Sequence, residues 1–279
     1  MRNKEAVEKN IASYIEEDVV EDVYLHEVVK NNDQTCVGLI IKGKENISPI
    51  IYLKEFYEDM ISYNEPFEKI LENIGSMYCD SVKNVSHFIG REIDFSLEAI
   101  RDRITMRVSD MTLNKECLKA KVIYPLGNNL CMTFYVTLGD SSAACITESV
   151  AIANGYFEPE MLFEIASERA SKEDPTMFGT IVSQLIGNGA QPLETLTKDN
   201  LGSDQMYVLT NASAQFGAAA LWQGNTMSRI AYLLDDDYYV IPSSIHELLI
   251  ISMADAPSVS NMLSMVSEVN GAGEFISVK

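Results

Sequence analysis

Side chains that could support hydrolysis gather in one short segment, Pro242-Ser243-Ser244-Ile245-His246-Glu247. Ser244 and His246 lie two positions apart, so on an extended chain they share one face and Glu247 points to the other. A nucleophilic serine needs a base within hydrogen-bond reach and a third group that holds the base. Neighbours on one strand rarely meet this requirement, and the sequence has no G-x-S-x-G motif. We therefore assign no catalytic residue. Ser244, His246 and Glu247 are candidates only for an alternative, a Ser/His-dependent hydrolase-like enzyme.

The same region suggests a binding surface. Trp222 is the only tryptophan, and tyrosines follow it on an apolar run. Aromatic rings beside short polar groups suit such a surface, and burial on half-exposed strands is the competing explanation. The candidate binding residues are Trp222, Tyr239, Ser243 and His246. In the competing structural interpretation, the two serines satisfy backbone groups at a corner of the chain.

Metal and nucleotide sites are not predicted. Asp235-Asp236-Asp237 does not match the calcium-loop spacing, and three consecutive carboxylates converge poorly on one ion. Gly187-Asn188-Gly189 lacks the preceding strand and the lysine of a phosphate loop. The histidines, His26, His87 and His246, are dispersed. We expect no cofactor and no metal.

The composition is strongly acidic. The 279 residues include 21 Lys+Arg and 41 Asp+Glu, a formal net charge of -20. Such a surface repels the phosphates of nucleic acids and anionic membranes. We therefore expect no direct nucleic-acid contact and no membrane, and a partner, if there is one, would be a protein with a basic surface. Solubility alone would also account for the charge.

The sequence shows no signal peptide and no membrane-spanning run, and together with the cysteine usage this predicts a cytoplasmic protein. Residues 1–20 carry a charge every few positions and lack the apolar core of a signal peptide. No apolar run is long enough to span a bilayer. The five cysteines, Cys36, Cys79, Cys117, Cys131 and Cys145, are odd in number and contain no CxxC pair. Reduced thiols in a cytoplasmic protein fit this pattern best.

Periodicity predicts an α+β protein with mixed or antiparallel sheets flanked by helices. We expect a hairpin of strands 23–29 and 35–42 around an Asn/Asp turn at 30–34, and a long amphipathic helix from Phe67 to Phe88. Further expected helices are 3–17, 49–62, 96–108, 159–172, 178–186, 226–234 and 259–269. Further expected strands are 121–124, 130–138, 206–210, 218–223, 238–241 and 246–252.

Two regions are expected: a helical N-terminal region with the hairpin and the long helix (1–110), and an α+β region (111–279). A single continuous domain is the alternative. Phe134-Tyr135-Val136-Thr137 followed by Ala143-Ala144 echoes Met206 to Thr210 followed by Ala218 to Ala220. This echo suggests a weak internal repeat of strand, turn, small-residue strand and helix.

Several segments resemble an uncharacterised bacterial domain-of-unknown-function family from gut anaerobes and their mobile elements. They include Asn46 to Leu53, Met206 to Asn211 and, most specifically, Tyr239 to Glu247, which reads YVIPSSIHE. The resemblance implies a cytoplasmic α+β protein of one shared architecture and carries over no functional residue.

The absence of an assembled catalytic, metal or nucleotide motif favours a non-enzymatic binding or regulatory protein that acts through a protein partner. The alternatives are the Ser/His-dependent hydrolase-like enzyme and an acidic mimic that antagonises a nucleic-acid-binding defence protein.

Overall fold

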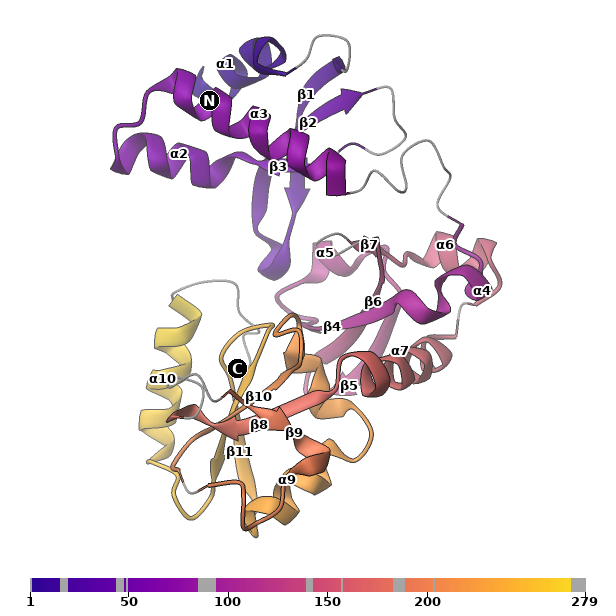
Figure 1. Ribbon diagram of the computed structural model, residues 1–279, viewed down its shortest axis with the longest axis vertical. Coiled ribbons are helices and arrows are strands. Elements are labelled where there is room, and N and C mark those ends of the chain that lie inside the picture. Colours follow the sequence, from indigo (N-terminus) through magenta and orange to yellow (C-terminus); the bar gives the residue numbers. More distant parts are fainter. Residues whose placement is uncertain are drawn as a thin grey trace. The chain divides into compact units, whose positions relative to one another are not determined.

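The computed structural model describes residues 2–15, 20–43, 48, 50–84, 94–138, 143–156, 158–182, 189–202 and 204–271. These residues form helices and three antiparallel sheets (Figure 1), which confirms the predicted α+β class. The chain divides into two compact units, residues 1–95 with 137–144, and residues 96–136 with 145–279. The boundary expected at residue 110 coincides with the end of strand β4 (Ile104–Asp110), inside the second unit.

The first unit contains a three-stranded sheet of order β1-β2-β3. The expected hairpin is confirmed as β1 (Val20–Val29) and β2 (Thr35–Gly43), and β3 (Ile50–Tyr52) pairs with β2. Asn32 and Asp33 have left-handed φ angles of 58° and 49°, which Asn and Asp tolerate. The two turn residues therefore allow the tight connection that was predicted.

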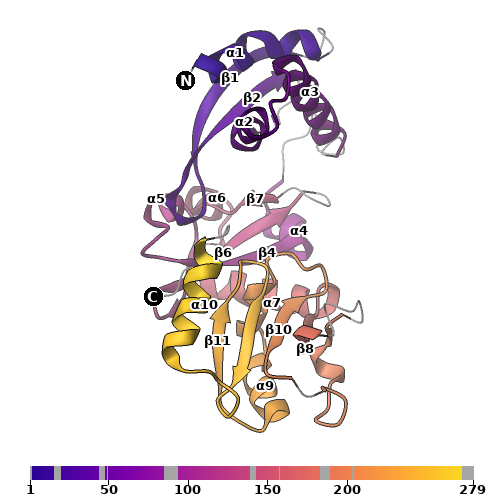
Figure 2. The ribbon, with the colours of Figure 1, turned by 90° about the vertical axis from the view of Figure 1, so that its left-hand side faces the viewer.

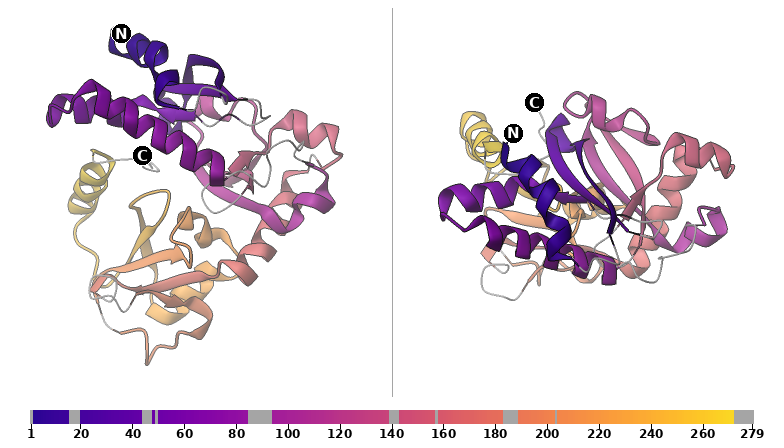
Figure 3. Two further views of the ribbon diagram at one scale, coloured as in Figure 1. Left: turned by 45° about the horizontal axis from the view of Figure 1, so that its top comes forward. Right: turned by 90° about the horizontal axis from the view of Figure 1, so that it is seen from above.

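Helices cover this sheet: α1 (Arg2–Asn10), the 3-10 turn η1 (Ile11–Tyr14), α2 (Leu53–Ser62) and α3 (Phe67–Asn84). Helix α3 lies across the sheet (Figure 1, Figure 3), and its stripe Ile70, Leu71, Ile74 and Tyr78 is buried, as predicted. The expected continuation to Phe88 lies outside the described residues. The helix expected from Pro49 begins only at Leu53, because the preceding residues join the sheet as β3.

The second unit contains two sheets. The larger has the order β11-β12-β10-β8-β9, and the smaller has the order β4-β6-β5, with β7 paired to β6. The strands are β5 (Ile123–Gly127), β6 (Leu130–Thr137), β7 (Ala143–Cys145), β8 (Thr176–Thr180), β9 (Gln191–Pro192), β10 (Tyr207–Asn211), β11 (Tyr238–Pro242) and β12 (Leu248–Ser252).

Helices of the second unit pack on both sheets. Helix α7 (Pro159–Glu173) lies on β4 and β5, and α10 (Val259–Gly271) lies beside β11 (Figure 2). The shorter helices are α4 (Leu97–Ile100), η4 (Arg101–Arg103), α5 (Lys115–Leu118), α6 (Glu148–Ala153), η5 (Leu193–Thr195), η6 (Gly217–Trp222) and α9 (Thr226–Leu234). No helix in the described residues is long and apolar enough to cross a membrane.

The structure differs, in part or in whole, from three further predicted elements. The helix expected over 96–108 ends at Arg103 and continues as strand β4, in which Ile104, Met106 and Val108 are buried alternately. Apolar residues at positions 104 and 108 fit one helix face, but burial at every second residue from 104 to 108 is typical of a strand. The helix expected over 178–186 has its first residues in β8, because Phe178 and its neighbours pair with β10. Residues 181–182 are helical, and 183–186 lie outside the described residues.

The segment 218–223, expected as a strand, is the 3-10 helix η6. Gly217 and the three alanines after it are all buried, and small side chains let this helix lie close to β10. The second copy of the suggested repeat therefore has a helix where the first has strand β7.

Candidate functional site

The segment between β11 and β12 forms the corner that contains the serine, histidine and glutamate candidates. The Ser244 hydroxyl oxygen accepts the backbone N–H of His246 at 3.0 Å, and the Ser244 N–H donates to the Glu247 carbonyl at 3.1 Å. The Ser243 hydroxyl donates to Glu247 Oε1 at 3.2 Å. The short polar groups of the corner are therefore hydrogen-bonded to one another.

The His246 ring is held from outside the corner. The backbone N–H of Phe216 donates to His246 Nδ1 at 3.1 Å. A backbone amide can only donate, so Nδ1 carries no proton and the neutral ring is protonated at Nε2. A Ser/His mechanism needs an unprotonated nitrogen facing the serine. Nδ1 accepts from Phe216 instead, and Ser244 Oγ bonds to the His246 backbone, so these contacts add no support to the hydrolase alternative.

Phe216 links the histidine to the smaller sheet. Its ring lies 5.1 Å from the His246 ring, and the Arg107 guanidinium lies 3.7 Å from its centroid. The same guanidinium lies 3.9 Å from the centroid of the Tyr135 ring. Cation–π contacts of this kind are stabilising when they are partly desolvated. A chain of contacts therefore links β6 to the corner through Tyr135, Arg107, Phe216 and His246.

The backbone at Phe216 is strained. Its φ angle is 56°, a left-handed value that a bulky residue adopts only when the surroundings enforce it. The turn before it is held by Asn211, whose amide donates to the Gln215 carbonyl at 2.8 Å and whose oxygen accepts the Gln215 N–H at 3.0 Å. These bonds fix the backbone that presents the Phe216 N–H to the histidine.

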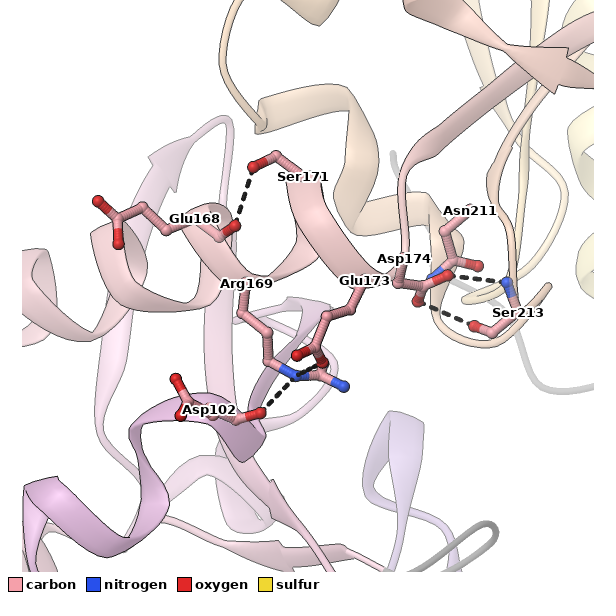
Figure 4. Close-up of polar contacts among 8 residues, drawn as sticks. All are labelled: Asp102, Glu168, Arg169, Ser171, Glu173, Asp174, Asn211 and Ser213. Atoms are coloured by element: carbon pink, nitrogen blue, oxygen red, sulfur yellow. Dashed lines mark hydrogen bonds and ion pairs between the residues drawn. The ribbon is translucent and has the colours of Figure 1, made fainter.

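Asp174, directly after α7, anchors that turn to the helix (Figure 4). Its carboxylate accepts Asn211 Nδ2 at 2.7 Å, the Ser213 N–H at 2.8 Å and the Ser213 hydroxyl at 2.9 Å. One turn earlier, Arg169 donates to the Asp102 carbonyl and pairs with Glu173. The C-terminal end of α7 is thereby fixed on both sides.

A groove of about 800 Å³ runs along α7 within the second unit. Its walls are residues of α7, of β8 and the segment before it, of β9 and η5, and of the loop between η6 and α9. They are Phe163, Glu164, Ser167, Glu168, Ser171, Pro175, Thr176, Pro192, Leu193, Glu194, Trp222, Gln223, Gly224, Asn225 and Thr226. This volume lies in the range of small-molecule and peptide side-chain sites.

Three carboxylates and two aromatic residues, Phe163 and Trp222, are part of the lining of this groove. Glu164, Glu168 and Glu194 are exposed carboxylates, and the described lining contains no lysine or arginine. Glu168 does pair with Arg101 at 3.7 Å, an exposed contact of small energy. Trp222 stands at the end of η6 and is half-buried. The lining therefore suits a cationic group beside an aromatic face.

Trp222 also borders a second pocket of about 390 Å³ with Met227, Tyr238 and Pro242 in its wall. Burial raises the pKa of the Tyr238 hydroxyl above its usual value. Tyr239, the neighbouring candidate, instead packs against Ile241, Ile251 and Met262. Of the predicted binding residues, the structure thus places Trp222 at both pockets, Ser243 and His246 in the corner, and Tyr239 beneath α10.

The carboxylate side of the groove was missed from the sequence. Glu164 and Glu168 lie on the helix that was expected over 159–172, but nothing in the sequence shows that η5 and the η6–α9 loop approach them. In the described part of the chain no group of three or more His, Cys, Asp or Glu is placed to hold a metal ion. Asp236 instead accepts the Ser252 hydroxyl at 2.7 Å and the Ala254 N–H at 2.8 Å, as expected for a turn.

Fold and site together define an α+β protein whose second unit presents an acidic groove with an aromatic wall. The chain belongs to a family of unknown function, DUF5688, which matches residues 2–273. No curated protein and no solved structure matches it.

Proposed function

We propose that this is a non-enzymatic binding protein that takes a lysine- or arginine-containing segment of a partner protein into the groove beside Trp222. The observation that carries the proposal is the groove itself, in which three carboxylates and the indole line about 800 Å³. Carboxylates attract a basic side chain, and an aromatic face adds a cation–π contact.

The surrounding charge supports the same partner chemistry. The protein carries a formal net charge of -20, which steers cationic partners toward it and keeps nucleic acids away. The five cysteines are free thiols, which fits a protein of the reducing cytoplasm. The resemblance noted in the sequence extends the proposal to a bacterial setting on mobile elements, where a partner encoded beside this chain is the first to test.

Trp222 provides the test, because the protein's only tryptophan lines the groove. A pentalysine peptide is titrated into the full chain while tryptophan fluorescence is recorded, with a pentaglutamine peptide as the uncharged control. We expect a saturable change with pentalysine only. A flat titration with pentalysine and with a pentaarginine peptide would overturn the proposal.

Charge variants show whether the groove is the binding site. E164Q/E168Q removes two lining carboxylates, and E158Q/E160Q removes two exposed carboxylates at the start of the same helix that do not line the groove. Exposed ion pairs contribute up to about 1 kcal/mol each, so we expect the groove variant to weaken binding roughly five- to tenfold. Equal weakening by the two variants would show that overall charge, not the groove, is responsible.

A further inference from the structure

Lys121 lies in an unusual setting for a lysine in this protein. It is half-buried beside the smaller sheet of the second unit, where it forms an isolated bridge with Thr147. Its Nζ lies 3.2 Å from Cys117 Sγ and 3.1 Å from the Tyr135 hydroxyl. The amine is thus held between a thiol and a phenol.

Two further thiols surround this lysine, and both are poor nucleophiles. Burial raises the pKa of Cys131 to about 11, and burial raises the pKa of Cys145 as well, although Lys121 opposes both shifts. Thiols that keep their protons are oxidised slowly. Cys117 is the thiol in direct contact with the lysine.

We propose that Cys117 and Lys121 form a reversible covalent S–N cross-link, a sulfenamide, when hydrogen peroxide oxidises the thiol. The two atoms that bond are already in contact, so the cross-link requires side-chain rotation and no rearrangement of the strands. The Tyr135 hydroxyl keeps the amine facing the sulfur.

The chemistry proceeds in two balanced steps. The Cys117 sulfur attacks one peroxide oxygen, the O–O bond breaks, and a sulfenic acid and one water form. The sulfur loses two electrons and the peroxide gains them. The neutral Lys121 nitrogen then attacks the sulfur, the S–O bond breaks, and the departing hydroxide takes a proton from the nitrogen to become a second water. The protein loses two hydrogen atoms in total.

The second step becomes faster as the pH rises. Burial alone would lower the pKa of the Lys121 ammonium, but its bonds to Tyr135 and Cys117 outweigh burial and raise the pKa above its usual value. The attacking nitrogen must first lose its proton, so alkaline conditions favour the cross-link.

Mass spectrometry of the peroxide-treated full chain at mildly alkaline pH tests the proposal. We expect a mass loss of about two units, since two hydrogens are removed, and restoration of the original mass by dithiothreitol. Trypsin does not cut after a modified lysine, so the peptide with Cys117 should be joined to one that begins at Ala120. A disulfide with Cys145 would instead leave a joined peptide that begins at Val122.

Single substitutions show which side chains form the cross-link. C117S and K121R should lose the mass change. C145S and the matched control K119R, which alters an exposed lysine paired with Glu116, should keep it. Y135F should slow the cross-link in a folded protein. Loss of the change in C145S, its persistence in K121R, or accumulation of sulfinic acid alone in the wild type would overturn the proposal.

Discussion

At the scale of single residues, the YVIPSSIHE segment contains side chains that bond chiefly to backbone groups. The sequence was sufficient to predict a corner at Pro242 to Ser244, because proline and serine there are typical of turns. It could not predict that His246 would accept a hydrogen bond from Phe216, thirty positions earlier. That contact depends on the left-handed backbone at Phe216, which local sequence does not signal for a phenylalanine.

Replacing His246 tests this bond. In H246A the Phe216 N–H loses its acceptor and the Phe216 ring loses a neighbour, so we expect the free energy of unfolding to fall by about 1–3 kcal/mol. H246N places a side-chain oxygen near the position of Nδ1 and should recover part of the loss. Urea denaturation measures both variants, and equal stability of H246A and wild type would refute the structural role.

Asp236 gives a prediction about pH. The Ser252 hydroxyl, followed by the Ala254 N–H, lowers the pKa of this carboxyl below its usual 3.8. A depressed folded-state pKa adds stability that is fully present above 3.8 and is lost as the pH falls through the folded value. The stability difference between wild type and D236N should therefore shrink as the pH is lowered from 6 toward 2.5.

Urea midpoints of both proteins across this pH range measure the effect of Asp236. S252A removes the hydroxyl that contributes most to the lowered pKa of Asp236. The stability of S252A should therefore depend less on pH than that of the wild type. A difference that stays constant down to the lowest pH at which the protein folds would contradict the assignment.

At the scale of elements, the predictions succeeded where several signals agreed. The β1–β2 hairpin had two β-type runs and Asn/Asp residues at the turn, and α3 had a stripe that continued over many turns. They failed at β4, where the spacing of apolar residues fits both a helix and a strand, and at η6, where a run of alanines was predicted to be a strand. The packing of η6 against β10 favours the helix, and contacts with a distant segment cannot be predicted from local sequence.

Gly217 is the element-scale test, because a Cβ there would lie 2.4 Å from Thr210 Oγ1 and 2.6 Å from both Asn211 N and the His246 carbonyl oxygen. G217A should destabilise the protein by about 3 kcal/mol, the upper part of the range for overpacking. G155A is the matched control, since Gly155 has a φ of 74° but nothing within 4 Å of an added Cβ.

Only backbone strain, about 1–2 kcal/mol, is expected for G155A. Thermal or urea unfolding compares the two variants. If G155A lowers the free energy of unfolding more than G217A does, the close approach of η6 to β10 and the corner is not the reason for a glycine at position 217.

At the scale of the whole molecule, the periodicity of apolar residues was enough to predict the α+β class. It was not enough to predict the groove, whose walls come from segments that run from α7 to the start of α9. Only the folding of the second unit brings these segments together.

Salt should weaken the proposed binding, because the attraction is partly the long-range field of a chain with net charge -20. The screening length is about 10 Å at 0.1 M salt and about 3 Å at 1 M. We expect the association rate of pentalysine, followed by Trp222 fluorescence in stopped flow, to fall at least roughly tenfold between 0.05 and 0.5 M salt. A rate that does not depend on salt would mean that charge does not guide the encounter.

The two units are interleaved along the chain, since residues 137–144 belong to the first unit although residues 96–136 belong to the second. A ribosome releases the chain from its N-terminus, and domains tend to fold as units during synthesis. Strands β4 and β5 and most of β6 therefore emerge before the last segment of the first unit has been translated. We expect the first unit to stay incomplete until residue 144 has been translated, and the second unit to mature only after the segment from residue 145 onward has followed.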